Sequence, residues 1–201
     1  MIETAHQVPL RLVVAEDEPI IRLDLVECLG DEGYDVVANT GRGDEVLALV
    51  EEHDPDLVIL DIKMPGIDGI EAAKQITERR LAGVVILTAY SQRDLIERAT
   101  EAGAHGYLVK PWQRQDLVPA VEVAHARHLE TTALAGEASD LEEQLQARKV
   151  IDRAKGQLMD DHGMSENDSF RFIQTTAMGQ RRSMRDVAVD ILEHGLVPDT
   201  D

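Results

Sequence analysis

The chain is 201 residues long and has a formal net charge of −19, from 39 acidic and 20 basic side chains. This charge repels nucleic acid and anionic membranes at long range, so a contact with either has to be made by a local cluster of basic groups. The length allows one sizeable hydrophobic core together with a smaller second unit. A single cysteine, Cys28, excludes an intramolecular disulfide and is expected to act as a small packing residue.

The sequence shows no pattern typical of a signal peptide or of a membrane-spanning segment. Residues 1–9 have neither the basic start nor the apolar stretch of a signal peptide. No apolar run reaches the roughly 20 residues that a membrane-spanning helix needs. We therefore expect a cytoplasmic protein that has no membrane partner.

Short apolar runs alternate with amphipathic segments over the first half of the chain. The runs lie at 10–15, 35–38, 57–60, 84–87 and 107–109, and the amphipathic segments at 19–32, 43–53, 69–79 and 92–102, with a fifth after Gln113. Apolar runs of this length are typical of strands that are buried on both faces. Five alternations of strand and helix predict an α/β fold, with a parallel sheet covered by helices on both faces.

After Gln113 the pattern is helical, with no further strand signal. A seven-residue repeat places apolar side chains at Leu134, Ala138, Leu141 and Leu145. This repeat predicts a short coiled coil that would join two copies of the chain. The alternative is a solvent-exposed linker helix, and Gly136 lowers its helix propensity by up to about 1 kcal/mol relative to Ala.

Three short helices are predicted beyond Arg148. Ser165 and Ser183 are each followed three residues later by an aspartate, a pattern that resembles a capping box and marks the start of the second and third helices. The first helix is expected to end near Gly163 and the third before Gly195. The expected core positions are Val150, Ile151, Ala154, Leu158 and Met159 in the first helix, Phe170, Ile173 and Ala177 in the second, and Met184, Val187, Ala188 and Ile191 in the third.

Carboxylates follow two of the predicted strands at the edge of the sheet where ligands collect. Glu16 and Asp17 come after the first strand, and Asp61 ends the third. Carboxylates brought together repel one another, so their convergence predicts a hard divalent cation with oxygen ligands, for which Mg²⁺ is the natural candidate. With the repulsion reduced by the ion, Asp61 would attack phosphorus as a nucleophile and form an aspartyl phosphate.

Two further side chains suit the charge that this product carries. Thr88 and Lys110 follow the fourth and fifth strands, and a hydroxyl and an ammonium group can both bind phosphoryl oxygens. Pro111 permits a cis peptide bond that would hold Lys110 in position. Each of these residues taken singly has an ordinary structural explanation, and only their combination predicts a site. Tyr107 is expected to be either a half-buried core aromatic or a side chain that reports the switch by changing rotamer.

Residues 10–129 resemble the receiver domain of two-component response regulators. The resemblance is carried by Glu16-Asp17, Asp61 in DIKMPGIDG, Thr88 in LTAY and Lys110-Pro111 in YLVKP. It implies a flavodoxin-like, doubly wound sheet of five parallel strands and phosphotransfer to Asp61 from a sensor histidine kinase. It also implies that Asp17, Asp61 and the backbone carbonyl of Lys63 hold Mg²⁺ beside Glu16, and we expect Thr88 and Tyr107 to act as the switch.

Residues 150–191 resemble the ANTAR domain, an antitermination-regulator type of RNA-binding module. The matching residues are Ala154-Lys155-Gly156, Leu158-Met159, Gly163-Met164-Ser165, Phe170, Ala177-Met178, Ser183-Met184 and Val187-Ala188. The resemblance implies binding of paired RNA hairpins that compete with a transcription terminator. From Lys149 onward the chain has seven basic and ten acidic side chains, so phosphate contacts need clustered cations. The candidates for these contacts are Lys155, Arg171, Arg181, Arg182 and Arg185.

The predicted organisation is a receiver domain at 8–129, a helical linker at 130–148 and a three-helix ANTAR-like domain at 149–195. The predicted protein is a phosphorylation-switched regulator that modifies its own aspartate and is not an enzyme for a separate substrate. The alternative is a DNA-binding regulator that uses the tail as a helix-turn-helix. A phosphatase fits less well because Lys63 stands where such enzymes carry a second Asp, and Gly41-x-Gly43 lacks the third glycine of a dinucleotide loop.

Overall fold

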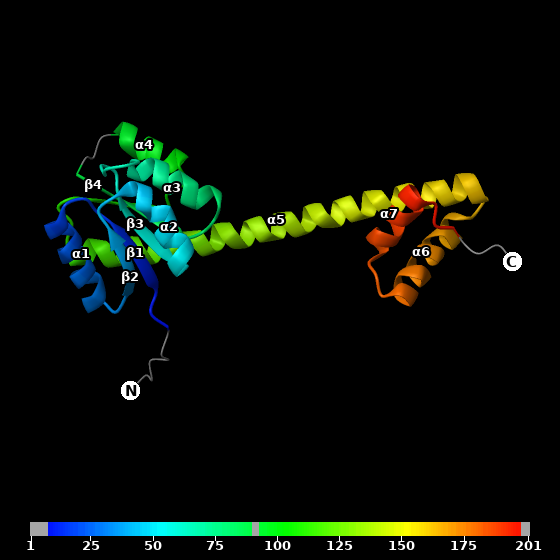
Figure 1. Cartoon of the computed structure of the whole chain (residues 1–201), viewed down its shortest axis with the longest axis horizontal. Helices are drawn as coiled ribbons and strands as arrows, with labels where there is room; N and C mark the ends of the chain where they lie inside the picture. Colours follow the sequence, from blue (N-terminus) through cyan, green and yellow to red (C-terminus); the bar gives the residue numbers. More distant parts are fainter. Residues whose placement is uncertain (1–7, 90–92, 198–201) are drawn as a thin grey trace. The chain divides into compact units, whose positions relative to one another are not determined.

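The computed structural model describes residues 8–89 and 93–197, and the chain divides into two compact units, 1–133 and 134–201 (Figure 1). The first unit contains the sheet and the second contains the helical tail. Helix α5 (Arg114–His162) begins in the first unit and ends in the second. Among the described residues, no helix combines the length and the apolar content that crossing a bilayer would require.

The first unit is a five-stranded parallel sheet in the order β2-β1-β3-β4-β5. Its strands are β1 (Arg11–Ala15), β2 (Asp35–Thr40), β3 (Leu57–Asp61), β4 (Gly83–Thr88) and β5 (Gly106–Val109), and its helices before α5 are α1 (Pro19–Asp31), α2 (Gly43–His53), α3 (Gly69–Glu78) and α4 (Arg93–Glu101). The prediction of a flavodoxin-like, doubly wound sheet is therefore confirmed. Each predicted strand lies within two residues of its observed bounds, and the predicted start of the fourth helix at Gln92 lies outside the described residues.

Alternating side chains along β1, β3 and β4 enter two separate hydrophobic cores. In β1, Val13 packs in the core under α2, α3 and α4, whereas Leu12 and Val14 pack in the core under α1 and α5. Leu25 and Cys28 of α1 belong to the second core, where Cys28 is buried as expected. Because β3 and β4 lie inside the sheet and are covered on both faces, every residue in them is buried, which explains their continuous apolar sequence.

The order of the strands positions the candidate site. The chain leaves β1 to form β2 on one side of it, and then returns to form β3 on the other side. At such a switch point the loops after the two central strands diverge, and a crevice opens at their carboxyl ends. Glu16 and Asp17 directly follow the carboxyl end of β1, and Asp61 is the last residue of β3.

The second unit is built by the end of α5 together with α6 (Glu166–Gln180) and α7 (Met184–His194). The predicted caps are confirmed: Ser165 Oγ accepts a hydrogen bond from the Asp168 backbone N–H, and Ser183 Oγ accepts one from Asp186. The buried core of the unit consists of Ala154, Leu158, Ile173, Ala177, Val187, Ala188 and Ile191. These are seven of the expected core positions.

Phe170 does not lie in this core, and the expectation for it was wrong. Its side chain is 41 % exposed, whereas Ser169 has no exposed surface. The buried stripe of α6 runs through Ser169, Ile173 and Ala177 at intervals of four residues, and Phe170 is rotated away from it. Ser169 can be buried because its hydroxyl donates a hydrogen bond to the carbonyl of Ser165. Met159, at 40 % exposed, also lies largely outside the core, and Met184 only partly packs against it.

The predicted seven-residue repeat lies wholly within α5. Leu134, Leu141 and Leu145 are 59, 60 and 58 % exposed, so no other described part of the chain covers them. Gly136 is accommodated inside the helix. The helical part of the expectation is confirmed, and pairing with a second copy stays a prediction.

Candidate functional site

Three carboxylates converge at the carboxyl edge of the sheet. Glu16, Asp17 and Asp61 each offer one oxygen atom, and these atoms all lie within 4.8 Å of one another. Glu16 has no exposed surface and Asp61 is 6 % exposed, whereas Asp17 faces solvent. Burial raises the pKa of the Glu16 and Asp61 carboxyl groups, and the neighbouring negative charges raise it further.

Lys110 supplies the positive charge of the cluster. Its Nζ atom lies 2.6 Å from Oε2 of Glu16 and 3.2 Å from Oδ2 of Asp61. Burial disfavours the ammonium form, but the contacts with both carboxylates outweigh this effect and raise the pKa of Lys110. Lys110 is placed by its own backbone, since its N–H donates to the carbonyl of Thr88 at 2.7 Å. The peptide bond between Lys110 and Pro111 is cis, as predicted.

The two expected switch residues lie on neighbouring strands but in different environments. Thr88 ends β4 and is buried beside the backbone of Lys110. Tyr107 lies on the edge strand β5 and is 49 % exposed. The structure therefore places Thr88 against the backbone of Lys110 and leaves Tyr107 half-exposed on the edge strand.

The loop between β3 and α3 carries Lys63, which is exposed and follows Asp61 by two residues. Two backbone hydrogen bonds hold this loop: Gly43 N–H donates to the carbonyl of Pro65, and Gly69 N–H donates to that of Ile62. A Cβ atom on Gly69 would lie 1.9 Å from the carbonyl oxygen of Asp61. At this position only glycine allows the start of α3 to approach the end of β3.

Sequence reasoning did not find the contribution of these glycines or of Arg22. A Cβ atom on Gly43 would lie 2.0 Å from the carbonyl oxygen of Ile67, and this close packing is visible only in three dimensions. Arg22 of α1 donates from Nη1 to the carbonyl oxygen of Glu16 and so ties α1 to the acidic loop. The glycines at the starts of α2 and α3 were the signal available in the sequence, whereas a single arginine in a helix gives none.

A cavity of about 530 Å³ opens beside the carboxylates, between the β3–α3 loop and α4. Asp17 and Lys63 line it, together with Asp68 and Arg98, whose side chains form an ion pair of 3.5 Å. Of the three carboxylates of the cluster, Asp17 lines this cavity.

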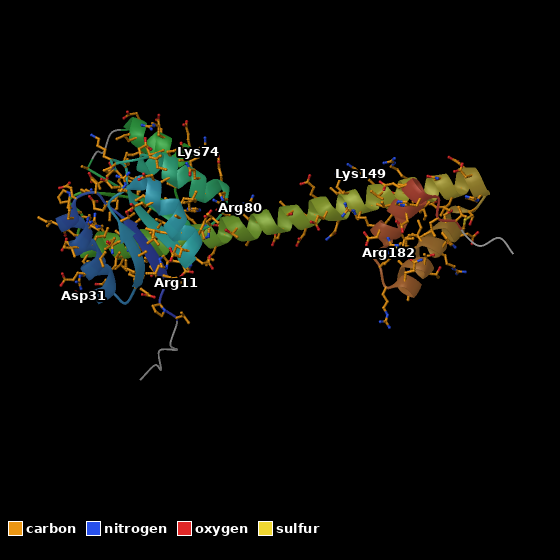
Figure 2. All side chains as sticks on the ribbon, viewed as in Figure 1. Arg11, Asp31, Lys74, Arg80, Lys149 and Arg182 are labelled. Atoms are coloured by element: carbon orange, nitrogen blue, oxygen red, sulfur yellow. The ribbon has the colours of Figure 1, made fainter. Side chains whose placement is uncertain are left out.

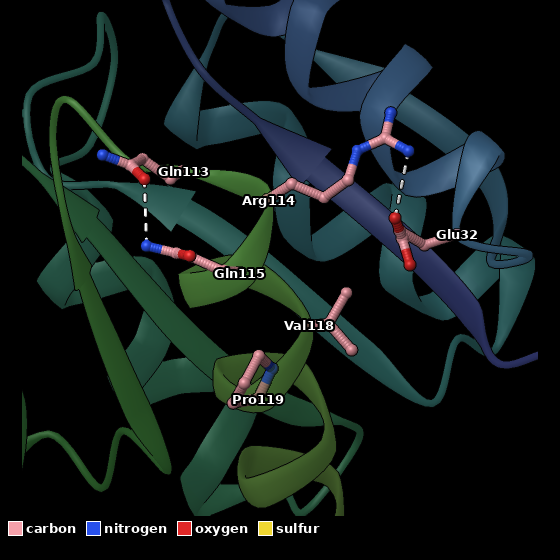
Figure 3. Close-up of a pocket in the computed structure, with 6 residues that line it drawn as sticks. All are labelled: Glu32, Gln113, Arg114, Gln115, Val118 and Pro119. Atoms are coloured by element: carbon pink, nitrogen blue, oxygen red, sulfur yellow. Dashed lines mark hydrogen bonds and ion pairs between the residues drawn. The ribbon is translucent and has the colours of Figure 1, made fainter.

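A second cavity, of about 620 Å³, contains none of the predicted site residues. It lies between the end of α1 and the start of α5, where Arg114 pairs with Glu32 at 3.1 Å (Figure 3). Arg114 also pairs with Asp31 at 2.7 Å. These exposed ion pairs fasten the first turn of α5 to α1.

The five cations expected to contact RNA fall into two groups. Lys155 pairs with Asp152 at 3.0 Å and with Glu166 at 2.9 Å, and only 16 % of its side chain is exposed. Arg182, labelled in Figure 2, pairs with Asp190 at 2.6 Å. Both side chains already have carboxylate partners within the unit.

The second group consists of Arg171, Arg181 and Arg185, which are all exposed. Within residues 8–89 and 93–197, none of these three guanidinium groups has an ion pair or a side-chain hydrogen bond. They are therefore available to an external anion. Arg181 ends α6 in the left-handed conformation, with φ of 55°.

Comparison with known proteins identifies a domain family in each of the two units. The family model of the response regulator receiver domain matches residues 12–122, and that of the ANTAR domain matches residues 139–192. The transcriptional regulatory protein PdtaR of Mycobacterium tuberculosis is 53 % identical over 186 residues, which cover 92 % of this chain and 91 % of that protein.

Solved receiver structures share the fold of the first unit. A two-component response regulator of the LuxR family from Aurantimonas is 33 % identical, with a TM-score of 0.56, over 59 % of this chain and 86 % of that one. A chain of the CheX–CheY–BeF3–Mg²⁺ complex from Borrelia burgdorferi is 27 % identical, with a TM-score of 0.54, over 56 % of this chain and 87 % of that one. The chain belongs to the response regulators that join an N-terminal receiver domain to a C-terminal ANTAR domain.

Proposed function

We propose that Asp61 accepts a phosphoryl group from a sensor histidine kinase, and that this modification changes how the ANTAR unit binds RNA hairpins that control transcription antitermination. The observation that carries the first half is the position of the Asp61 carboxylate. It lies 3.2 Å from the Lys110 ammonium and beside two further carboxylates, at the open edge of the sheet. Asp61 is thus surrounded by groups that can hold a phosphoryl product.

The proposed reaction needs no separate base, because an ionised carboxylate is itself the nucleophile. One Asp61 oxygen forms the new P–O bond while the P–N bond of the donor's phosphohistidine breaks, and the leaving imidazole takes up a proton. Oδ1 of Asp61 accepts the backbone N–H of Ile62 at 2.8 Å, which fixes the orientation of the carboxylate. The Lys110 ammonium and the Thr88 hydroxyl would bind oxygens of the product.

The donor set at the site fits Mg²⁺. Three carboxylate oxygens within 4.8 Å of one another are the hard ligands that this ion prefers, and the cluster is open on the side of Asp17. Asp17 and Asp61 would hold the ion directly, with the backbone carbonyl of Lys63 as a further ligand and Glu16 behind them. When bound, Mg²⁺ would reduce the repulsion between the carboxylates and an incoming phosphoryl group.

We assign the chain no reaction on a separate substrate. The nucleophile proposed here is a residue of the chain itself, and the residue two positions later is Lys63 rather than a second acid. The only chemistry expected of the protein alone is the gain and loss of its own phosphoryl group.

The RNA half of the proposal is supported by the ANTAR match and by three exposed cations without carboxylate partners among the described residues, Arg171, Arg181 and Arg185. We further propose that two copies pair through the exposed leucines of α5, Leu134, Leu141 and Leu145, because a heptad seam buries such side chains only against a second helix. Duplex DNA is the competing ligand, since a three-helix unit could also act as a helix-turn-helix.

The experiment treats the full chain with acetyl phosphate and MgCl2 and measures phosphorylation by intact-protein mass spectrometry. We expect one phosphoryl group on the wild type, none on Asp61→Asn, and one on the control Asp35→Asn, whose side chain is exposed at the opposite end of the sheet. Phosphorylated Asp61→Asn would contradict the assignment. Binding of hairpin RNA and duplex DNA is then compared at one salt concentration, and preference for duplex DNA would favour the competing function.

A further inference from the structure

One face of helix α6 has a composition that differs from the rest of the chain. Asn167, Phe170, Arg171, Gln174 and Met178 recur at intervals of three and four residues, so their side chains share an arc of about 100° on the helix. All five residues are exposed, and Arg181, which is also exposed, directly follows the last turn of the helix. We call these six residues the α6 stripe.

The stripe contains no carboxylate, although the chain has 39 acidic and 20 basic residues. The two acids of α6 point away from it and have partners of their own. Glu166 pairs with Lys155 at 2.9 Å, and Asp168 accepts a hydrogen bond from the Ser165 hydroxyl at 2.6 Å. Two arginines and two amides are therefore exposed, and neither acid of α6 lies among them, which suits a polyanion as partner.

Phe170 adds an aromatic face to this polar surface. The second unit contains two phenylalanines, Phe170 and Phe172, and neither tyrosine nor tryptophan, and Phe172 packs partly against the core. Phe170 is 41 % exposed, and Met178 on the same stripe is 74 % exposed. Proteins that bind single-stranded nucleic acid combine cations along the backbone with exposed aromatic side chains on which bases stack.

We propose that the α6 stripe binds the unpaired loop of an RNA hairpin, with Phe170 stacking on a base and Arg171 and Arg181 contacting phosphates. Asn167 and Gln174 would read base edges through their amides, which donate and accept hydrogen bonds. This inference rests on the proposed RNA-binding function and specifies where and how the RNA is held. A loop is the fitting target because its bases are unstacked and exposed, whereas those of a duplex are not.

The test uses the full chain and a pool of RNA stem-loops with one fixed stem and a randomised loop. The wild type selects its preferred hairpin from the pool, and the dissociation constants of all variants are then measured for that hairpin. Phe170→Ala should weaken binding about 5- to 150-fold, the range reported for loss of one stacked base. Phe170→Trp should keep the affinity, while Phe170→Leu should lose it despite being apolar.

Two matched controls lie off the stripe within the same unit. Val197→Ala shortens an apolar side chain that is 43 % exposed, and Arg153→Ala removes an exposed arginine from α5. Val197→Ala should leave the affinity unchanged. Arg171→Ala should reduce the slope of log affinity against log salt by about 0.7, the value for one single-stranded phosphate contact, and Arg153→Ala should not. Circular dichroism checks that every variant keeps the helical content of the wild type.

The outcomes separate this inference from the function on which it rests. A wild type that binds no hairpin in the pool would overturn RNA binding itself. A wild type that binds tightly, with Phe170→Ala and Arg171→Ala within twofold of it, would leave RNA binding standing and overturn the stripe. Equal losses in Phe170→Ala and Phe170→Trp would overturn stacking, and weakened self-association of Phe170→Ala with unchanged RNA affinity would assign the stripe to a protein contact.

Discussion

The ammonium group of Lys110 lies 2.6 Å from Oε2 of Glu16, a residue with no exposed surface. Apart from this contact, Oε2 has no hydrogen-bond partner among the described residues. The second oxygen of Glu16 accepts the backbone N–H of Glu18 at 3.2 Å. Lys110 is therefore the main group that compensates the buried charge of Glu16, in addition to any role in binding phosphate.

Lys110→Met should destabilise the receiver unit by about 3 kcal/mol, because it leaves a buried carboxylate without its partner. The measurement is urea unfolding without Mg²⁺, followed by the fluorescence of Trp112, the single tryptophan, which packs against the receiver core. The control is Lys74→Met, since the Lys74–Glu78 pair is 3.9 Å long and more than half exposed. We expect little change there. Equal losses in the two variants would show that Lys110 does not compensate Glu16.

Gly69→Ala should both destabilise the receiver and impair the site. The added Cβ would lie 1.9 Å from the Asp61 carbonyl oxygen, so the start of α3 has to move away from β3 at a cost of about 1–3 kcal/mol. Gly30→Ala is the matched control, because Gly30 lies in α1 with no atom within 4 Å of the added methyl group. That change should stabilise the unit by up to about 1 kcal/mol. The same Trp112 unfolding experiment measures both variants, and a Gly69→Ala protein as stable as wild type would refute the clash.

Asp17→Asn should weaken Mg²⁺ binding at least tenfold, as it removes the exposed negative ligand of the carboxylate cluster. Isothermal titration calorimetry with MgCl2 measures the affinity directly, and Asp35→Asn serves as the control for the loss of one charge. Adding a chelator should prevent phosphorylation of the wild type by acetyl phosphate. Unchanged Mg²⁺ affinity in Asp17→Asn would remove this residue from the ligand set.

Acid should destabilise the receiver through a histidine pair at the opposite end of the sheet. His105 Nδ1 accepts the backbone N–H of Val84 at 3.1 Å, and the ring stacks edge-on against that of His128 at 5.3 Å between centroids. Burial, followed by neighbouring cationic groups, lowers the pKa of both imidazoles. As the pH falls, the unfolded chain therefore takes up protons at a higher pH than the folded chain does. The contribution of the two histidines to the free energy of unfolding is present above about pH 6.5 and is lost as the pH falls through the folded pKa.

The variant His105→Asn tests this, since an asparagine oxygen can still accept the Val84 N–H but does not titrate. The free energy of unfolding, measured through Trp112 from pH 8 to pH 5, should fall less steeply for His105→Asn than for the wild type. We compare the slopes of the free energy of unfolding against pH. The raised pKa values of Glu16 and Asp61 make this free energy rise as the pH falls, and they do so equally in both proteins. Parallel slopes would contradict the role of His105.

Substitutions of Arg182 and of Asp190 are expected to change RNA affinity in opposite directions. The two side chains pair at 2.6 Å, and the carboxylate competes with any phosphate for the guanidinium group. Arg182→Ala should weaken hairpin binding, whereas Asp190→Asn should strengthen it by freeing the arginine and removing a negative charge. Electrophoretic mobility shifts with one hairpin at one salt concentration give both values. If both variants bind more weakly, the pair serves the fold of the unit and Arg182 is not an RNA contact.

The elements of the receiver could be predicted because each is encoded by a local pattern. Continuous apolar residues predicted β3 and β4, and serines followed by aspartates predicted the starts of α6 and α7, all of which the structure confirms. The same local reasoning misplaced Phe170, since an apolar residue at the edge of a helical face fits two different stripes. Burial of Ser169 in its place depends on a hydrogen bond to Ser165 that periodicity does not show.

The order of residues alone determined which side chains end the parallel strands, and hence that Asp17, Asp61 and Lys110 face a common edge. Only the tertiary structure decided which groups neutralise one another: Lys110 with Glu16, Arg182 with Asp190, and three arginines left open to solvent. The physical reason is the separation along the chain over which each interaction acts. Strand and helix formation depend on neighbours within a few residues, whereas ion pairing and burial depend on distances between segments that are far apart in the chain.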